Sequence, residues 1–151
     1  MKAGIPILIL TLITNLCAID STGALEPFRW QHRIILVAAP AKDADRIRKE
    51  MEADKAAVKE RHILWFVVAA GQLLTNYSAR LPEDFSSKII RSYLPEVGEG
   101  TGVCLIGKDG GVKTRQAKLD LKALYARIDS MPMRQAEMRQ NRERDDSSSF
   151  K

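Results

Sequence analysis

The stretch Val103-Cys104-Leu105-Ile106-Gly107-Lys108-Asp109-Gly110-Gly111-Val112-Lys113 decides the fold. In it an apolar run ends at Lys-Asp-Gly-Gly, and a shorter, more polar run follows. Asp-Gly between two strand-like runs is a strong hairpin signal, because glycine adopts the positive φ that such turns require. The stretch therefore predicts an antiparallel hairpin that closes a sheet made by upstream residues and is covered by a downstream helix.

Two upstream runs predict strands that are buried on both faces. Residues 34–39 (IILVAA) and 63–69 (ILWFVVA) are apolar throughout, as is typical of parallel strands covered by helices. Between them, residues 43–59 show helical spacing of apolar side chains, with Asp43 as a suitable N-cap. A strand, a helix of this length and a second strand form a crossover unit, so the two strands are expected to be parallel neighbours.

The rest of the chain completes the pattern. Residues 71–80 are predicted to be a loop, which carries the glycosylation sequon Asn76-Tyr77-Ser78. A short helix follows within residues 82–93. After the hairpin comes the clearest helical spacing in the chain, and Pro132 ends or kinks this helix. Its apolar positions are Leu121, Leu124, Tyr125, Ile128 and Met131.

The resulting element order is βαβαββα, with a four-stranded mixed sheet and helices on both faces. This α/β arrangement is thioredoxin-like, and it places the first and third strands at the centre of the sheet. Residues 25–30 form a lead-in, in which Phe28 and Trp30 are expected to pack the chain end onto the sheet.

The first 24 residues are typical of a secretory signal peptide. Lys2 gives a positive start, an Ile- and Leu-rich run follows, and Thr22-Gly23-Ala24 offers small residues for cleavage. The apolar run is shorter than the roughly 20 residues of a membrane anchor. We therefore expect cleavage after Ala24, no membrane span afterwards, and a periplasmic or secreted protein. Residues 25–145 would then form one domain, and residues 146–151 a disordered tail.

Composition and charge limit the possible partners. The chain is 45% hydrophobic and 28% charged, as in ordinary globular proteins, and its net charge is +5. The positive excess lies between residues 108 and 127, a surface that would suit an acidic ligand or an envelope protein, or would simply be a solvated face. No aromatic residues interleave this patch, so nucleic-acid binding is not expected.

Four pieces of sequence together resemble a known family. They are residues 28–33 (FRWQHR), 60–61 (ER), 105–113 (LIGKDGGVK) and 128–134 (IDSMPMR). The family is an uncharacterised, secreted, thioredoxin-like domain of unknown function. It is also a module of animal matrix proteins such as coiled-coil-domain-containing protein 80 and the sushi-repeat-containing proteins. The resemblance implies the fold and an exported location, and no established activity. The family commonly has an Asp where His62 stands here.

The sequence gives little support to catalysis. A thioredoxin-type site needs a cysteine at the start of the first helix, where the chain has Pro40-Ala41-Lys42-Asp43 instead. After signal cleavage, Cys104 is the single cysteine, and its place within a strand favours a packing role. We assign no catalytic residue, no metal ligand and no cofactor. A degenerate thiol-dependent redox enzyme using Cys104 is the alternative.

Polar residues of the motif pieces are the candidate binding residues. They could form a salt-bridge cluster at one end of the sheet, or hold an acidic ligand, because arginine binds carboxylates through two parallel hydrogen bonds. The sequence thus favours a non-catalytic binding or structural module of the cell envelope with no defined substrate. The candidates are Arg33, Lys108, Asp109, Asp129 and Arg134.

Overall fold

A computed structural model describes residues 23–98 and 100–148. The predicted signal peptide therefore lies outside the described residues, apart from Gly23 and Ala24. The elements follow in the order η1 (Gly23–Phe28, a 3-10 helix), β1 (Arg33–Ala39), α1 (Ala41–Ala53), α2 (Lys55–Glu60), β2 (Ile63–Ala69), β3 (Gln72–Thr75), α3 (Phe85–Tyr93), β4 (Gly102–Ile106), β5 (Val112–Gln116), α4 (Leu121–Asp129) and α5 (Pro132–Ser148).

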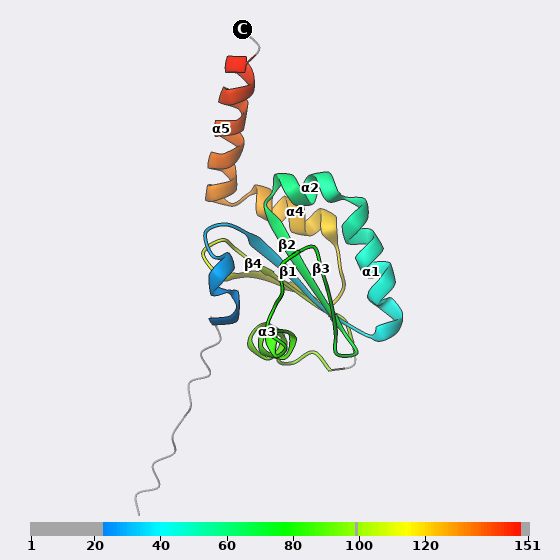
Figure 1. The fold of residues 1–151 in the computed structure, drawn as a ribbon. Coiled ribbons are helices and arrows are strands. Elements are labelled where there is room, and N and C mark those ends of the chain that lie inside the picture. Colours follow the sequence, from blue (N-terminus) through cyan, green and yellow to red (C-terminus); the bar gives the residue numbers. More distant parts are fainter. Residues whose placement is uncertain (1–22, 99, 149–151) are drawn as a thin grey trace, which may run out of the picture.

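The strands form one mixed sheet in the order β3-β2-β1-β4-β5 (Figure 1). β1 pairs in parallel with β2, as the crossover pattern predicts, and antiparallel with β4. β4 and β5 form the predicted antiparallel hairpin, with a register shift between Leu105 and Ile106. Gly110 lies in the turn with φ of +81°, which is the conformation that calls for glycine.

The sheet has five strands, so the prediction of four was wrong. The additional strand is β3, in a stretch that the sequence predicts to be a loop. It pairs antiparallel with β2 through the two-residue turn Ala70-Gly71, in which both residues have positive φ. Such a turn matches the twist of a hairpin, but alanine is not among the residues that usually announce it. The hairpin signal is therefore weak in the sequence.

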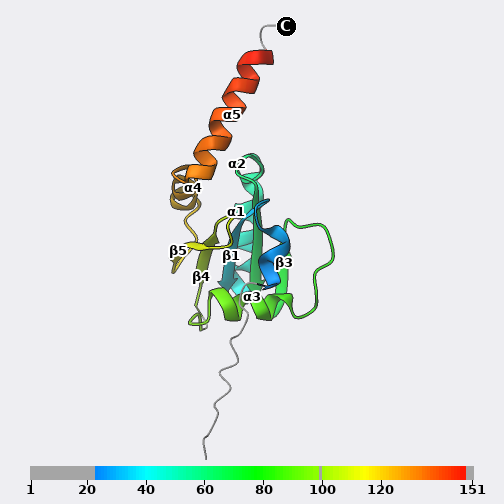
Figure 2. The ribbon, with the colours of Figure 1, turned by 90° about the vertical axis from the view of Figure 1, so that its left-hand side faces the viewer.

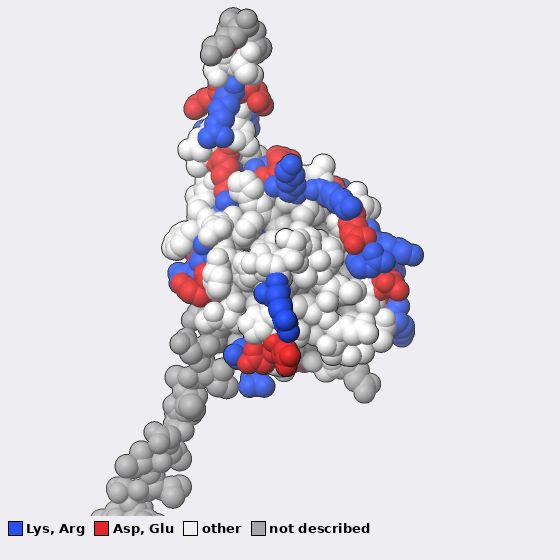
Figure 3. Space-filling model, viewed as in Figure 1, with Lys and Arg blue, Asp and Glu red and all other residues white. Residues whose placement is uncertain are grey.

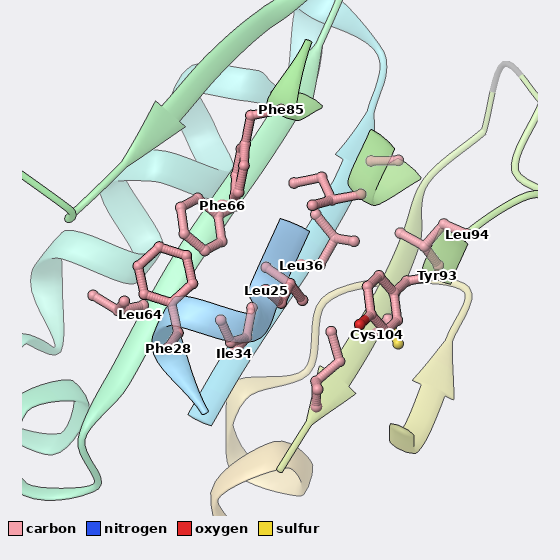
Figure 4. Close-up of a cluster of buried hydrophobic side chains, with 13 residues drawn as sticks. Leu25, Phe28, Ile34, Leu36, Leu64, Phe66, Phe85, Tyr93, Leu94 and Cys104 are labelled. Carbon is pink, nitrogen blue, oxygen red and sulfur yellow. The ribbon is translucent and has the colours of Figure 1, made fainter. Parts of the chain in front are cut away.

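Each face of the sheet is covered by helices and has its own apolar core. On one face η1 and α3 pack on the strands, and Phe28, Phe66 and Phe85 lie together there (Figure 4). The ring centroids of Phe66 and Phe85 are 5.0 Å apart. On the other face α1, α2 and α4 supply Ile47, Val58 and Leu124, among others, to a second core. The central strands are thus buried on both sides, as their continuous apolar runs predict.

Two helices differ from their predicted bounds. The single helix expected over residues 43–59 is divided at Asp54 into α1 and α2, and α1 begins at Ala41 with Pro40 as its N-cap, instead of Asp43. α5 continues to Ser148, so residues 146–148 are helical although the sequence predicts a disordered tail there. Residues 149–151 lie outside the described part. Beyond its first turns, α5 extends away from the body of the protein (Figure 2).

The surface has two notable features. The indole of Trp30 is 62% exposed, so the expectation that it packs on the sheet was wrong, whereas Phe28 is buried as expected. In the view of Figure 3, charged side chains lie mainly along the helices at the rim and on α5, and the centre of the face is largely uncharged.

Within the described residues, no helix combines the length and apolar character needed to cross a membrane.

Candidate functional site

Arg33 is the first residue of β1, and its side chain is only 1% exposed. Its guanidinium donates two hydrogen bonds to the carboxylate of Glu137, with Nη1 to Oε2 at 3.1 Å and Nη2 to Oε1 at 3.2 Å. Nη1 also donates to the backbone oxygen of Arg61 at 2.9 Å. A cation can be buried in this way when an opposite charge and polar oxygens replace its water.

Lys108 follows β4 and reaches the same carboxylate. Its Nζ lies 2.8 Å from Glu137 Oε1 and 2.8 Å from His62 Nδ1, and the side chain is 8% exposed. Glu137 therefore accepts hydrogen bonds from two cations, Arg33 and Lys108. Because Lys108 donates to His62 Nδ1, this nitrogen must carry a lone pair, which fits a neutral ring with its proton on Nε2.

Arg134 lies in the first turns of α5 and is 1% exposed. Its Nε donates to Asp129 Oδ1 at 3.3 Å, and its Nη2 binds the carboxylate of Glu60. Arg61 approaches Asp129 from another side, with Nε to Oδ1 at 3.0 Å and Nη2 to Oδ2 at 2.7 Å. Arg134 also lies 3.8 Å from Glu137 Oε2, which links this group to Arg33 and Lys108.

These seven residues form one charged cluster at the end of the sheet where the parallel strands begin. The cluster joins the start of β1, the residues before β2, the end of β4, the end of α4 and the first turns of α5. It lies at the opposite end of the sheet from the junction where β1 ends and α1 begins. The charged cluster consists of Arg33, Glu60, Arg61, Lys108, Asp129, Arg134 and Glu137.

Neighbouring charges lower the pKa of two carboxylates of the cluster, Glu137 and Asp129. Burial alone would raise the pKa of Glu137, but the hydrogen bonds from Lys108 and Arg33 outweigh it and lower this pKa. Burial likewise opposes the ionised form of Asp129, and the hydrogen bonds from Arg61 and Arg134 lower its pKa below the ordinary value. Both carboxylates are thus ionised at neutral pH, and each holds two basic side chains in place.

Two of the candidate residues have other surroundings. Asp109 does not join the charged cluster: its Oδ1 accepts from the Gly111 N–H at 3.1 Å, and its Oδ2 pairs with Lys113 at 2.6 Å. It is a turn residue of the hairpin. Cys104 lies in β4 and is 0% exposed, beside Tyr93 in Figure 4. Burial raises the pKa of the Cys104 thiol to about 11.

The sequence-predicted residues are therefore brought together in part. Arg33, Lys108, Asp129 and Arg134 meet in the charged cluster, and Asp109 does not. The main residue that sequence reasoning missed is Glu137, which has no motif of its own and lies in a strongly charged helix. Its spacing of three residues from Arg134 was the available signal. Within residues 23–98 and 100–148, no three His, Cys, Asp or Glu side chains converge as a metal site would need.

All residues of the charged cluster lie within the segment of the chain that matches a known protein family. A family model described as "Domain of unknown function (DUF4174)" matches residues 24–137. The chain belongs to this family. The DUF4174 segment ends at Glu137, so it includes every member of the charged cluster and leaves out most of the projecting part of α5. No curated protein and no solved structure matches the chain.

Proposed function

We propose that this DUF4174 protein is an exported, thioredoxin-like, non-catalytic module that binds or supports a partner in the cell envelope. The observation that carries the proposal is the state of the charged cluster. Its buried cations are held by carboxylates of the same chain, so they tie five separate segments together.

The topology supports the thioredoxin-like part of the proposal. A parallel pair, β1 and β2, lies beside an antiparallel hairpin, β4 and β5, with β1 next to β4 and helices on both faces. This is the arrangement expected from the sequence, with β3 added at the β2 edge. The signal-like residues 1–24 and the resemblance to modules of matrix proteins support export to the periplasm or the cell exterior.

The surroundings of Cys104 weigh against the alternative, a thiol-dependent redox enzyme. The reactive form of cysteine is the thiolate, and a pKa of about 11 leaves very little of it at neutral pH. The sulfur is also buried in a central strand, packed among apolar side chains of one core. A buried cysteine of this kind acts as a small apolar residue.

Two measurements on the full chain, expressed with its own N-terminus in a bacterial host, test the proposal. The mass of the exported protein is expected to show cleavage after Ala24. Cys104 is expected to react with a thiol reagent only on unfolding. An exported protein that keeps Met1 would contradict signal cleavage, and rapid labelling of folded Cys104 would favour the redox alternative.

A further inference from the structure

The charged cluster contains one more basic side chain than acidic side chains. Its four basic residues are Arg33, Arg61, Lys108 and Arg134, and its three acidic residues are Glu60, Asp129 and Glu137. Subtracting three from four leaves a net charge of +1, because the bond from Lys108 to Nδ1 of His62 fits a neutral ring. A buried positive charge without a counter-ion lowers the stability of the folded protein. An additional anion bound at the cluster would remove this cost.

The excess charge is located at Arg33 and Lys108, which share the single carboxylate of Glu137. A guanidinium has five N–H donors and an ammonium has three. Within the described residues, Arg33 uses three donors, two on Glu137 and one on the Arg61 carbonyl. Lys108 uses two, on Glu137 and His62. Donors therefore remain on both of these nearly buried cations.

A cavity of about 360 Å³ lies against these two side chains. Lys113 and Arg127 also line it, whereas Glu137 does not. The one acidic side chain in its wall is Asp109, which Lys113 neutralises at 2.6 Å. Arg127 has no carboxylate within 4.0 Å in the part of the chain that the structure describes. The basic side chains around the cavity, Arg33, Lys108, Lys113 and Arg127, thus outnumber the two carboxylates that pair with them, Asp109 and Glu137.

Part of the cavity lining is apolar. Met131, Pro132 and Met133 at the start of α5 supply it, and Met133 is 42% exposed. The start of a helix carries the positive end of the helix dipole, which adds to the attraction for an anion. The volume is in the lower part of the range of small-molecule sites. A ligand that fits this cavity has an oxyanion group for the cations and a short apolar body for the methionines.

We propose that this cavity binds a small organic anion whose carboxylate or phosphate group contacts Arg33 and Lys108 and whose apolar body packs on Met131 and Met133. The inference rests on the proposed function, because it specifies what the binding module holds. The anion supplies the negative charge that the cluster lacks. Arg127, which also lines the cavity, strengthens the attraction.

Thermal melts and calorimetric titrations of the full chain test this site. The probes are benzoate and phenyl phosphate, with acetate, inorganic phosphate and sodium chloride at matched ionic strength as references. We expect saturable binding and a raised Tm with an aryl anion, weaker with the references; the carboxylate and phosphate arms show which head group is preferred. Equal or stronger effects of acetate, phosphate or chloride would overturn the assignment.

Two variants locate the binding. Arg127→Gln is expected to weaken binding of the preferred aryl anion by roughly threefold to tenfold, the effect of one nearby charge in partly exposed surroundings. Lys122→Gln removes the same charge from the same helix, away from the cavity, and is expected to bind as the natural chain does. Equal losses in both variants would show a non-specific charge effect and would overturn the site.

Glu137→Gln provides an independent readout. This variant removes the carboxylate that competes for Arg33 and Lys108, so the aryl anion is expected to raise its Tm by more than it raises that of the natural chain. A rise no larger than that of the natural chain would contradict the proposal. If no anion binds while export occurs and Cys104 stays unreactive, the cavity assignment fails and the proposed function stands. A reactive Cys104 would instead overturn the proposed function.

Discussion

Glu137 holds two cations that are buried at the end of the sheet. Removing its charge by Glu137→Gln leaves Arg33 and Lys108 without their shared carboxylate, while the side chain keeps nearly the same shape. Breaking a buried ion pair from one side costs several kcal/mol in general. Because Glu137 is 19% exposed, we expect a loss of about 2–4 kcal/mol in the free energy of unfolding, measured by urea denaturation.

Glu143→Gln is the matched control, because Glu143 lies on the exposed part of α5. We expect its free energy of unfolding to stay within about 0.5 kcal/mol of the natural value. If the two variants lost stability equally, the charged cluster would not have the structural role assigned to it.

His62 makes the stability of the protein sensitive to weak acid. Burial of the ring lowers its pKa from 6.5, and the charge of Lys108 lowers it further, with smaller effects of Arg33 and His32 that Glu137 opposes. The unfolded chain therefore takes up its proton at a higher pH than the folded chain does. The stabilisation is complete above pH 6.5 and is lost as the pH falls through the lower, folded pKa.

We therefore expect the Tm to decline as the pH falls from about 6.5 to about 5, because the unfolded chain protonates His62 first. His62→Asp should reduce this decline and raise the Tm at neutral pH, because a carboxylate at this position can pair with Lys108. The measurement is scanning calorimetry across this range. A variant with the same decline as the natural chain would rule out His62 as the main cause.

For individual residues, the sequence predicts which side chains belong to the charged cluster better than it predicts which of them pair with one another. Arg33, Lys108, Asp129 and Arg134 were found because they belong to motif pieces with specific spacing. Asp109 was included with them, but its own turn takes its carboxylate. Sequence reasoning missed Glu137, because its spacing of three residues from Arg134 indicates that neighbour and gives no sign of the distant cations Arg33 and Lys108.

Among the elements, the β2–β3 pair is extended by the side chain of Asn76, which follows β3 and forms hydrogen bonds with the backbone of β2. Asn76 Oδ1 accepts from the Trp65 N–H at 2.9 Å, and Asn76 Nδ2 donates to the Ile63 carbonyl at 3.1 Å. Asn76→Ala leaves both backbone groups without these partners and is expected to cost about 1–3 kcal/mol. Asn76→Asp keeps an acceptor for Trp65 and should cost less, as chemical denaturation would show. Equal costs would mean that the two hydrogen bonds are not what stabilises this edge.

The hairpin turn gives a second prediction for an element. Gly110 has φ of +81°, and a Cβ there would lie 3.1 Å from the Arg29 side chain. Gly110→Ala should therefore lower the free energy of unfolding by about 1–2 kcal/mol. For Gly111→Ala, the nearest contact is 3.4 Å and φ is not positive, so we expect a smaller loss. A thermal melt of the two variants compares them directly, and equal losses would contradict the assigned turn geometry.

The helices and strands that were predicted correctly are those with strong local sequence signals. β1, β2 and the β4–β5 hairpin were predicted because their apolar runs are continuous and Asp-Gly marks the turn. β3 was missed because it is four residues long and follows an Ala-Gly turn. The break at Asp54 has no glycine or proline to announce it, so the helix pattern runs through it.

In the whole molecule, the first turns of α5 pack against other elements, and the rest of α5 is exposed. Arg134 and Glu137 connect its first turns to the sheet, and the residues from Arg139 to Ser148 are exposed. Deleting residues 143–151 is expected to change the free energy of unfolding by less than about 1 kcal/mol. Deleting residues 134–151 should reduce it by several kcal/mol, because the cluster then loses two members. Similar stabilities of the two truncated chains, measured by urea denaturation, would contradict this division.

The ion pair of Arg33 with Glu137 joins positions 104 residues apart, which has a consequence for synthesis of the chain. At roughly 5–20 residues per second, Glu137 is made about 5–20 s after Arg33. A chain that stops before residue 134 can make both apolar cores but leaves Arg33 and Lys108 without a counter-ion at a buried edge. Such a chain opens more readily at that edge and is exposed to proteases. The late ion pair therefore forms only in chains that have been made at least as far as Glu137.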